Sequence, residues 1–150
     1  MRLTALLCVL ALLPVKALAY SCAIDATALS FGAIEGITGV SQQSTATLTV
    51  KCQADTGVDS VVSYQIMIDG AETGGQRQMT AGNNTTNYQL YTSSNYQQIW
   101  NGSSGALTDS YTLTANTSET RTYTVYARMA PSFQDAPGTY IDTRSVSLLY

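Results

Sequence analysis

The stretch Gly138-Thr-Tyr-Ile-Asp-Thr-Arg-Ser-Val-Ser-Leu-Leu-Tyr150 at the end of the sequence has the pattern of a β-strand. One face of such a strand would carry the even-numbered residues, and four of these are apolar or aromatic: Tyr140, Val146, Leu148 and Tyr150. Such alternation is typical of a strand with one buried face, although Leu149 falls on the other parity. Because chain ends are usually polar and frayed, we expect this strand to need a partner, from its own domain or from another chain.

Strand-like runs recur along the rest of the chain, separated by clusters of Gly, Asn, Ser and Asp. We expect strands or strand-like pieces within residues 22–32, 44–52, 61–68, 78–79, 88–91, 98–100, 111–113 and 121–129, with a loop at 82–85. No long stretch carries apolar residues at helical spacing. Frequent turns without helices between them predict an all-β fold, an antiparallel sandwich in one domain.

Residues 1–19 have the three-part pattern of a secretory signal peptide. Met1-Arg2 is a basic start, residues 3–15 are an apolar run, and Ala17-Leu18-Ala19 is a small-x-small site. We therefore predict cleavage after Ala19 and a mature domain spanning residues 20–150.

A membrane anchor is the competing interpretation of the same segment. Its apolar run contains Pro14 and is too short for about 30 Å of hydrocarbon. Lipid attachment at Cys8 is disfavoured because bulky Leu7 stands where a small residue is needed. No other segment is apolar enough to span, so we expect no membrane segment in the mature protein.

The charge pattern excludes some classes of partner. Two of the seven basic residues, Arg2 and Lys16, lie in the signal segment, whereas all ten acidic residues follow it. An acidic mature domain without clustered Lys and Arg argues against nucleic acid and against an anionic membrane surface. Abundant Thr, Ser, Asn, Gln and Tyr are typical of neutral polar β surfaces.

The mature domain retains two cysteines, Cys22 and Cys52. An even number of cysteines in an exported chain indicates a disulfide. Closing a loop of about thirty residues would stabilise the fold by roughly 3–4 kcal/mol in the chain-entropy view. Two thiolates without any histidine would make only half a zinc site.

The sequence gives little support for catalysis or for a cofactor. It has no histidine, which excludes Ser-His-Asp and Cys-His arrangements and histidine-ligated metals. Asp55 and Asp59 are close in sequence, but they lie in a Gly-containing loop where acidic residues are usually solvated turn residues. A histidine-free hydrolase using two carboxylates and a calcium site in that loop are the weaker alternatives.

The sequence suggests roles for Trp100 and for three of the arginines. Trp100 could stack on a sugar at an exposed surface, but we favour a core position beside the turn that follows it. Arg121, Arg128 and Arg144 fall in predicted strands, and we expect them to pair with nearby acids or hydroxyl groups.

Several ordered pieces of the chain carry a family resemblance. They are Cys22 with Leu29-Ser-Phe-Gly32, Leu48-Thr-Val-Lys-Cys52, Tyr64-Gln-Ile-Met-Ile-Asp-Gly70, Arg77-Gln-Met79, Tyr88-Gln-Leu-Tyr91, Ile99-Trp100, Thr122-Tyr-Thr-Val-Tyr-Ala127 and Gly138-Thr-Tyr-Ile-Asp142 with the strand to Tyr150. In this order they resemble the spore coat protein U domain family, which includes subunits of archaic chaperone–usher pili. The resemblance covers essentially all of the mature chain.

The resemblance implies an immunoglobulin-like antiparallel β-sandwich that lacks its final strand. In such systems a periplasmic chaperone lends a strand, and a neighbouring pilus subunit later replaces it at the outer-membrane usher. Tyr140, Val146, Leu148 and Tyr150 would then line the groove that receives this strand, and the family disulfide would join Cys22 to Cys52. Export to the periplasm, display in a fimbrium and a part in adhesion and biofilm formation are the corresponding expectations, with no cofactor.

In one feature the sequence differs from that of a subunit that also donates a strand. Only Tyr20 and Ser21 precede Cys22 after the predicted cleavage, too few for a donor strand. The expectation is an acceptor at the pilus tip, the first domain of a longer tip adhesin, or a secreted adhesin or coat protein of the same fold that does not polymerise. An adhesin could contact a surface or a carbohydrate through loops such as 81–87 or 93–98.

Overall fold

The computed structural model describes residues 19–33, 40–71, 75–102, 104–131 and 135–150. These residues form an all-β immunoglobulin-like sandwich of two antiparallel sheets. The strands are β1 (Tyr20–Ala26), β2 (Gln42–Ala54), β3 (Ser60–Ile68), β4 (Arg77–Ala81), β5 (Asn84–Tyr91), β6 (Leu107–Leu113), β7 (Ser118–Met129) and β8 (Val146–Leu149).

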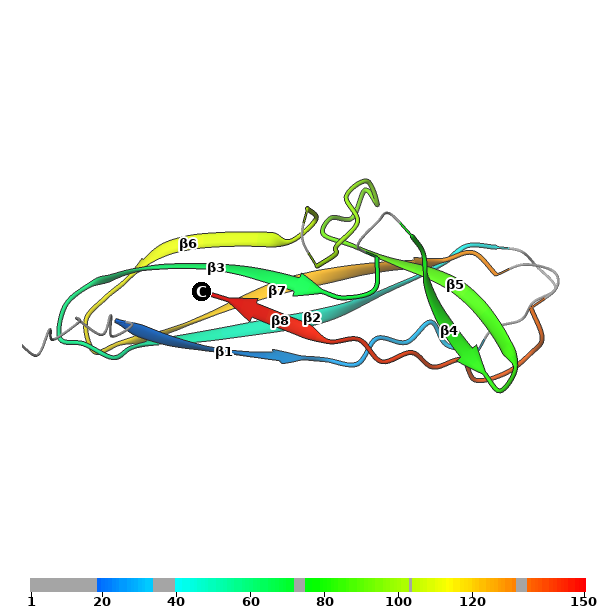
Figure 1. Ribbon diagram of the computed structural model, residues 1–150, viewed down its shortest axis with the longest axis horizontal. Coiled ribbons are helices and arrows are strands. Elements are labelled where there is room, and N and C mark those ends of the chain that lie inside the picture. Colours follow the sequence, from blue (N-terminus) through cyan, green and yellow to red (C-terminus); the bar gives the residue numbers. More distant parts are fainter. Residues whose placement is uncertain (1–18, 34–39, 72–74, 103, 132–134) are drawn as a thin grey trace, which may run out of the picture.

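The larger sheet has the strand order β1-β2-β7-β5-β4, and the smaller has the order β6-β3-β8. Figure 1 shows an elongated molecule whose strands run mostly along its length, with the β4–β5 hairpin at one end. The edge strands β1 and β8 lie near each other, one from each sheet.

The long pairing of β2 with β7 forms the centre of the larger sheet, from Gln42 opposite Met129 to Gln53 opposite Ser118. Strict alternation places every second side chain of both strands in the core. The buried set is Ala46, Leu48, Val50, Cys52 and Ala54 from β2 and Val125, Ala127 and Met129 from β7. The predicted inward faces of both strands are therefore confirmed.

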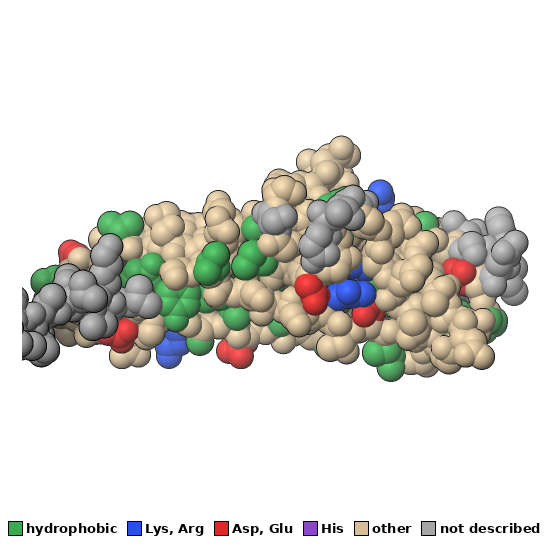
Figure 2. All heavy atoms as spheres, in the orientation of Figure 1, with side chains coloured by type: hydrophobic (Ala, Val, Ile, Leu, Met, Phe, Trp, Pro, Cys, Tyr) green, Lys and Arg blue, Asp and Glu red, His purple; other side chains and the backbone are tan. Residues whose placement is uncertain are grey.

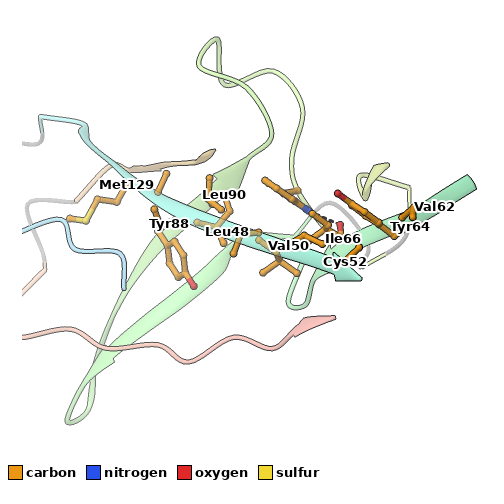
Figure 3. Packing of buried hydrophobic residues seen from close by; sticks show 14 of the residues in the cluster. Leu48, Val50, Cys52, Val62, Tyr64, Ile66, Tyr88, Leu90 and Met129 are labelled. Carbon is orange, nitrogen blue, oxygen red and sulfur yellow. Dashed lines mark hydrogen bonds between the residues drawn. The ribbon is translucent and has the colours of Figure 1, made fainter. Parts of the chain in front are cut away.

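Strand β3 supplies the opposing layer of the core. Val62, Tyr64, Ile66 and Ile68 are buried, as their parity predicts. Figure 3 shows side chains of β3 and β2 meeting between the sheets, among them Ile66 and Val50. Val61, on the other parity, is 68% exposed.

The Cys22–Cys52 disulfide joins β1 to β2. The two cysteines are directly opposite each other in a register that runs from Tyr20 opposite Ala54 to Ala26 opposite Leu48. Cys52 is fully buried, so the bond lies at the edge of the core. It fastens the edge strand β1 to the larger sheet.

Two buried polar side chains connect the sheets. The Trp100 indole N–H donates to the carbonyl of Ile66, 2.8 Å away, and the side chain is fully buried. The core position favoured for Trp100 is thus confirmed. Arg77 is also buried, and its guanidinium donates to the carbonyls of Ile68, Asp69 and Trp100.

The structure corrects several predicted details. The first strand ends at Ala26, and residues 27–33 continue outside it. The predicted loop 82–85 is a two-residue turn, because Gly82 adopts φ +61° and lets β5 begin at Asn84. Arg128 lies over the rings of Tyr91 and Tyr96, and among the described residues it pairs with no acid or hydroxyl.

Residues 1–18 of the predicted signal segment 1–19 lie outside the described residues. Within the part of the chain that is described, no helix is long and apolar enough to cross a membrane.

Replacing Cys22 and Cys52 together by alanine should destabilise the fold by about 2–4 kcal/mol, because the unfolded chain regains the freedom of the closed loop. The measurement, made on the chain held in complex with a strand-donating partner, is the urea midpoint at which this chain becomes susceptible to a protease. Reduced wild-type protein is the matched control and should unfold at the midpoint of the double variant. Equal midpoints for oxidised wild type and variant would contradict this role.

Candidate strand-binding groove

The edge strands β1 and β8 each pair on one side only among the described residues. β1 pairs with β2, and β8 pairs with β3 from Val146 opposite Ile68 to Leu149 opposite Gln65. Their outer edges belong to different sheets and border the same gap. A free edge carries unpaired N–H and C=O groups that can pair with another strand.

A groove with a volume of about 980 Å³ lies between these edges. One wall is formed by residues 26–33, from the last residue of β1 onward, and the other by residues 137–144 with Val146. Its floor is the core itself, formed by Ala46, Leu48, Ile68, Met79, Tyr88, Leu90 and Val125. We call this feature the acceptor groove.

Burial differs sharply between the central and the edge strands. Inward side chains of the central strands are covered, as Val50 and Ile66 are fully buried. The inward side chains of the edge strands, including Ile24, Val146 and Leu148, pack against the core but remain only half-buried. Figure 2 shows apolar side chains gathered on this face around the end of β8. The inward faces of β1 and β8 are therefore less completely covered than those of the central strands.

The segments that form the walls are fixed by a few contacts. On the β1 side, Thr27 exchanges hydrogen bonds with Thr47, and the Ser44 hydroxyl donates to the Ser30 carbonyl. On the other side, Ile141 forms a two-bond bridge with Thr80. Beyond the groove, the rings of Tyr20 and Tyr150 meet with centroids 5.8 Å apart, where β1 and β8 come together.

A polar cluster lies at the groove wall where the chain enters β8. Asp142 accepts hydrogen bonds from the Tyr88 hydroxyl at 2.7 Å and from Arg144 at 2.6 Å. Figure 3 shows the Tyr88 side chain pointing from β5 toward the segment that leads into β8. A side chain at Gly70, which has φ +91°, would collide with the Arg144 guanidinium, so glycine makes room for this cation.

The cluster changes the acidity of Tyr88. Burial and the hydrogen bond to Asp142 raise the pKa of Tyr88 to about 12, against the opposing effect of Arg144. The phenol therefore keeps its proton and can donate to Asp142 throughout the neutral range.

The four residues predicted for the groove divide into two pairs. Tyr140 and Val146 line it, and the Tyr140 hydroxyl donates to the Ala136 carbonyl. Leu148 packs against the core further along β8, and Tyr150, 41% exposed, contacts Tyr20. Leu149 points outward and is 58% exposed.

Sequence reasoning missed the wall formed by residues 26–33 and the Tyr88–Asp142–Arg144 cluster. The apolar side chains Leu29 and Phe31 were the available signal for the wall, because they share a parity just beyond β1. Asp142 and Arg144 are two residues apart in an extended stretch, but their link to Tyr88 is a long-range contact without a local signature.

A second ionic cluster lies away from the groove and joins the two sheets. Asp109 on β6 accepts from Tyr123 and Arg121 on β7, and Tyr123 also contacts Tyr64 on β3. Burial disfavours the charged carboxylate, but the hydrogen bonds from Tyr123 and Arg121 outweigh it and lower the pKa of Asp109. Burial and its contacts with Asp109 and Tyr64 raise the pKa of Tyr123.

The sequence profile of the spore coat protein U domain matches residues 4–147. The chain belongs to this family. Comparison with curated proteins gave no match.

A solved structure shares the fold. It is the CsuC–CsuE chaperone–tip adhesion subunit pre-assembly complex from archaic chaperone–usher Csu pili of Acinetobacter baumannii, and the matched chain is 18% identical with a TM-score of 0.55. The match covers 87% of this chain and 40% of that chain, so this family member spans less than half of its structural neighbour.

Within the described ranges, no group of three or more His, Cys, Asp or Glu residues lies close enough together to hold a metal ion.

Replacing Tyr88 by phenylalanine should remove a tyrosine that ionises at about pH 12. The raised pKa stabilises the fold below about pH 10, and that contribution is lost as the pH rises from 10 through 12. The measurement is the tyrosinate absorbance of wild type minus that of the variant, titrated in folded protein. The matched control is the same difference in denaturant, with an expected midpoint near 10; equal midpoints would contradict the assignment.

Proposed function

We propose that this chain is a structural subunit of an archaic chaperone–usher pilus and that the acceptor groove receives a donor strand. The observation that carries the proposal is the acceptor groove, whose walls hold half-buried apolar side chains such as Phe31 and Val146 beside strand edges that pair on one side only among the described residues. Family membership supports it, because the family includes such subunits, and so does the likeness in fold to a pilus complex.

An inserted strand would supply two things that the groove lacks, a backbone partner for a strand edge and a cover for half-buried apolar side chains. Its backbone would pair with the outer edge of β8 or β1, and its alternate side chains would cover the half-buried groove residues Leu29, Phe31 and Val146. Each apolar side chain that becomes fully covered contributes about 25 cal/mol for every Å² removed from water. The Tyr88–Asp142–Arg144 cluster would lie beside the backbone of the donor.

The proposed partners follow from the route of assembly. A periplasmic chaperone supplies the first strand, the outer-membrane usher is the site of exchange, and a neighbouring pilus subunit supplies the lasting strand. The route requires export, so residues 1–19 are proposed to be removed after Ala19, leaving a domain of residues 20–150. Cleavage there keeps Tyr20, whose ring contacts Tyr150, within the mature domain.

The finer part of the proposal is a position at the pilus tip, with a role in surface adhesion and biofilm formation. Its support is the likeness in fold to the Acinetobacter baumannii complex, which contains a tip adhesion subunit.

Co-expression with a periplasmic chaperone of the archaic class should give a one-to-one complex, measured by size-exclusion chromatography with light scattering. The mature domain alone should aggregate through its uncovered groove. If the mature domain alone is a monomer with a reversible, cooperative unfolding transition, the incomplete-fold proposal fails.

Replacing Val146 by aspartate should reduce recovery of the chaperone complex at least about tenfold, because the carboxylate would be buried against the apolar donor. Leu149→Asp is the matched control on the same strand, since Leu149 points outward, and its complex should form normally. Ala28→Trp obstructs the groove from an exposed position without altering a core residue, and it should also reduce the complex. Undiminished complexes for both groove variants would exclude the groove as the acceptor site.

The tip position has its own test, immunogold labelling of assembled fibres with an antibody to this chain. Label at fibre ends is expected. Label along the shaft would overturn the tip position and leave the subunit proposal intact. Absence of the chain from fibres, despite a chaperone complex, would favour the secreted adhesin or coat protein that does not polymerise.

A further inference from the structure

The outer face of the larger sheet carries a second hollow. It has a volume of about 410 Å³ and is lined by Gln43, Ser44, Thr45, Ser94, Tyr96 and Tyr126. We call it the tyrosine cleft. Its volume falls within the range typical of small-ligand sites.

The strand register explains why these residues lie together. Thr45 on β2, Tyr126 on β7 and Tyr91 on β5 are successive cross-strand partners. Their parity is opposite to that of buried Ala46 and Val125, so all three face outward. The segment after β5 returns over this row, because the Thr92 N–H donates to the Gln98 carbonyl. In Figure 1 this yellow-green segment rises from the sandwich after β5.

Two tyrosine rings form a corner in the cleft. The Tyr96 and Tyr126 rings are nearly perpendicular, at 84° with centroids 6.4 Å apart. Tyr91 supports Tyr96 from another side, with centroids 5.3 Å apart. Arg128 braces the group, with its guanidinium carbon 5.1 Å from the centroid of Tyr96. The corner is therefore held in place by its neighbours.

The loop that carries Tyr96 has an unusual backbone. Tyr96 adopts φ +55°, a left-handed backbone region that aromatic residues rarely occupy because it is strained. The loop is held by local hydrogen bonds, in which Asn95 Oδ1 accepts from the Ser93 hydroxyl and the Gln97 N–H. The chain thus keeps a strained tyrosine where its ring completes the corner.

The chemistry of the lining indicates the class of ligand. The six lining residues carry no charge, and the neighbouring Arg128 guanidinium lies over the Tyr91 and Tyr96 rings. The Ser44 hydroxyl is already engaged with the Ser30 carbonyl, which leaves the Gln43 amide and the hydroxyl groups of Thr45 and Ser94 at the rim. A pyranose ring matches this set, because its C–H face packs on an aromatic ring while its hydroxyl groups exchange hydrogen bonds with amides and hydroxyls. A stretch of nucleic acid would require a basic groove.

From this arrangement, we infer that the tyrosine cleft binds a neutral saccharide, with a sugar ring in the corner formed by Tyr96 and Tyr126. The inference rests on the proposed adhesive role and gives it a ligand class, but it does not depend on strand acceptance. The cleft lies on the outer face of β2 and β7, whereas the acceptor groove lies on their inner face.

The test is isothermal titration of the purified chaperone complex, or of the mature domain if it purifies alone, with cellotetraose, chitotetraose, maltotetraose and lactose. At least one should bind with a millimolar or tighter Kd. Tyr126→Ala should weaken that binding at least about tenfold, equivalent to about 1.4 kcal/mol or more. Tyr126→Phe keeps the ring and should retain most of the affinity.

Tyr96→Gly removes the second ring while relieving the positive φ, so the loop backbone should keep its course. This variant should also lose binding at least about tenfold. Asn116→Gly is the matched control, because Asn116 has φ +57° in the β6–β7 turn and lies outside the cleft. It should bind the saccharide like wild type.

Two outcomes would overturn the inference: no binding of any of the four saccharides at millimolar concentration, or binding that Tyr126→Ala and Tyr96→Gly leave unchanged. Recovery of the chaperone complex, measured on the same variants, separates this failure from failure of the proposed pilus role. Cleft variants should form the complex normally, whereas Val146→Asp should lose it.

Discussion

The attachment of β1 to β2 is the constraint on which the acceptor groove depends. A seven-residue antiparallel register and the Cys22–Cys52 disulfide hold β1 on the larger sheet, while β8 pairs with β3 in the smaller one. β1 approaches β8 where the rings of Tyr20 and Tyr150 meet, but its ladder with β2 keeps it in the larger sheet. The outer edges of β1 and β8 therefore belong to different sheets, and the acceptor groove lies beyond the point where they meet. The disulfide and the backbone hydrogen bonds of the two ladders thus keep the two strand edges in separate sheets.

Polar cross-links allow the sandwich to keep its shape around this gap. Arg77 joins β4 to the carbonyls at the end of β3, and Trp100 reaches the carbonyl of Ile66. The Asp109–Tyr123–Tyr64 cluster joins β6, β7 and β3. Buried polar groups are costly unless they are satisfied, so these links hold the sheets in one relative position. The groove walls can then remain apart without a strand between them.

Alternation in the sequence predicted the inward faces of β2, β3 and β7 correctly, because a period of two reports directly on a half-buried strand. The even number of cysteines predicted the disulfide, and the turn beside Trp100 indicated its core position. The alternation gave no sign of Arg77 as a core residue, since burial of a cation depends on carbonyls contributed by distant segments. The Tyr88–Asp142 contact was hidden for the same reason, and Tyr96 required a backbone conformation that composition does not encode.

The same alternation lets one pair of strands carry both candidate sites. Ala46 and Val125 point inward to the acceptor groove, and their neighbours Thr45 and Tyr126 point outward to the tyrosine cleft. Thr45 and Tyr126 can therefore change without altering the groove residues Ala46 and Val125 that neighbour them in sequence. A strand inserted in the groove would cover only the inner face. The cleft would stay exposed in an assembled subunit, as a saccharide site at a surface requires.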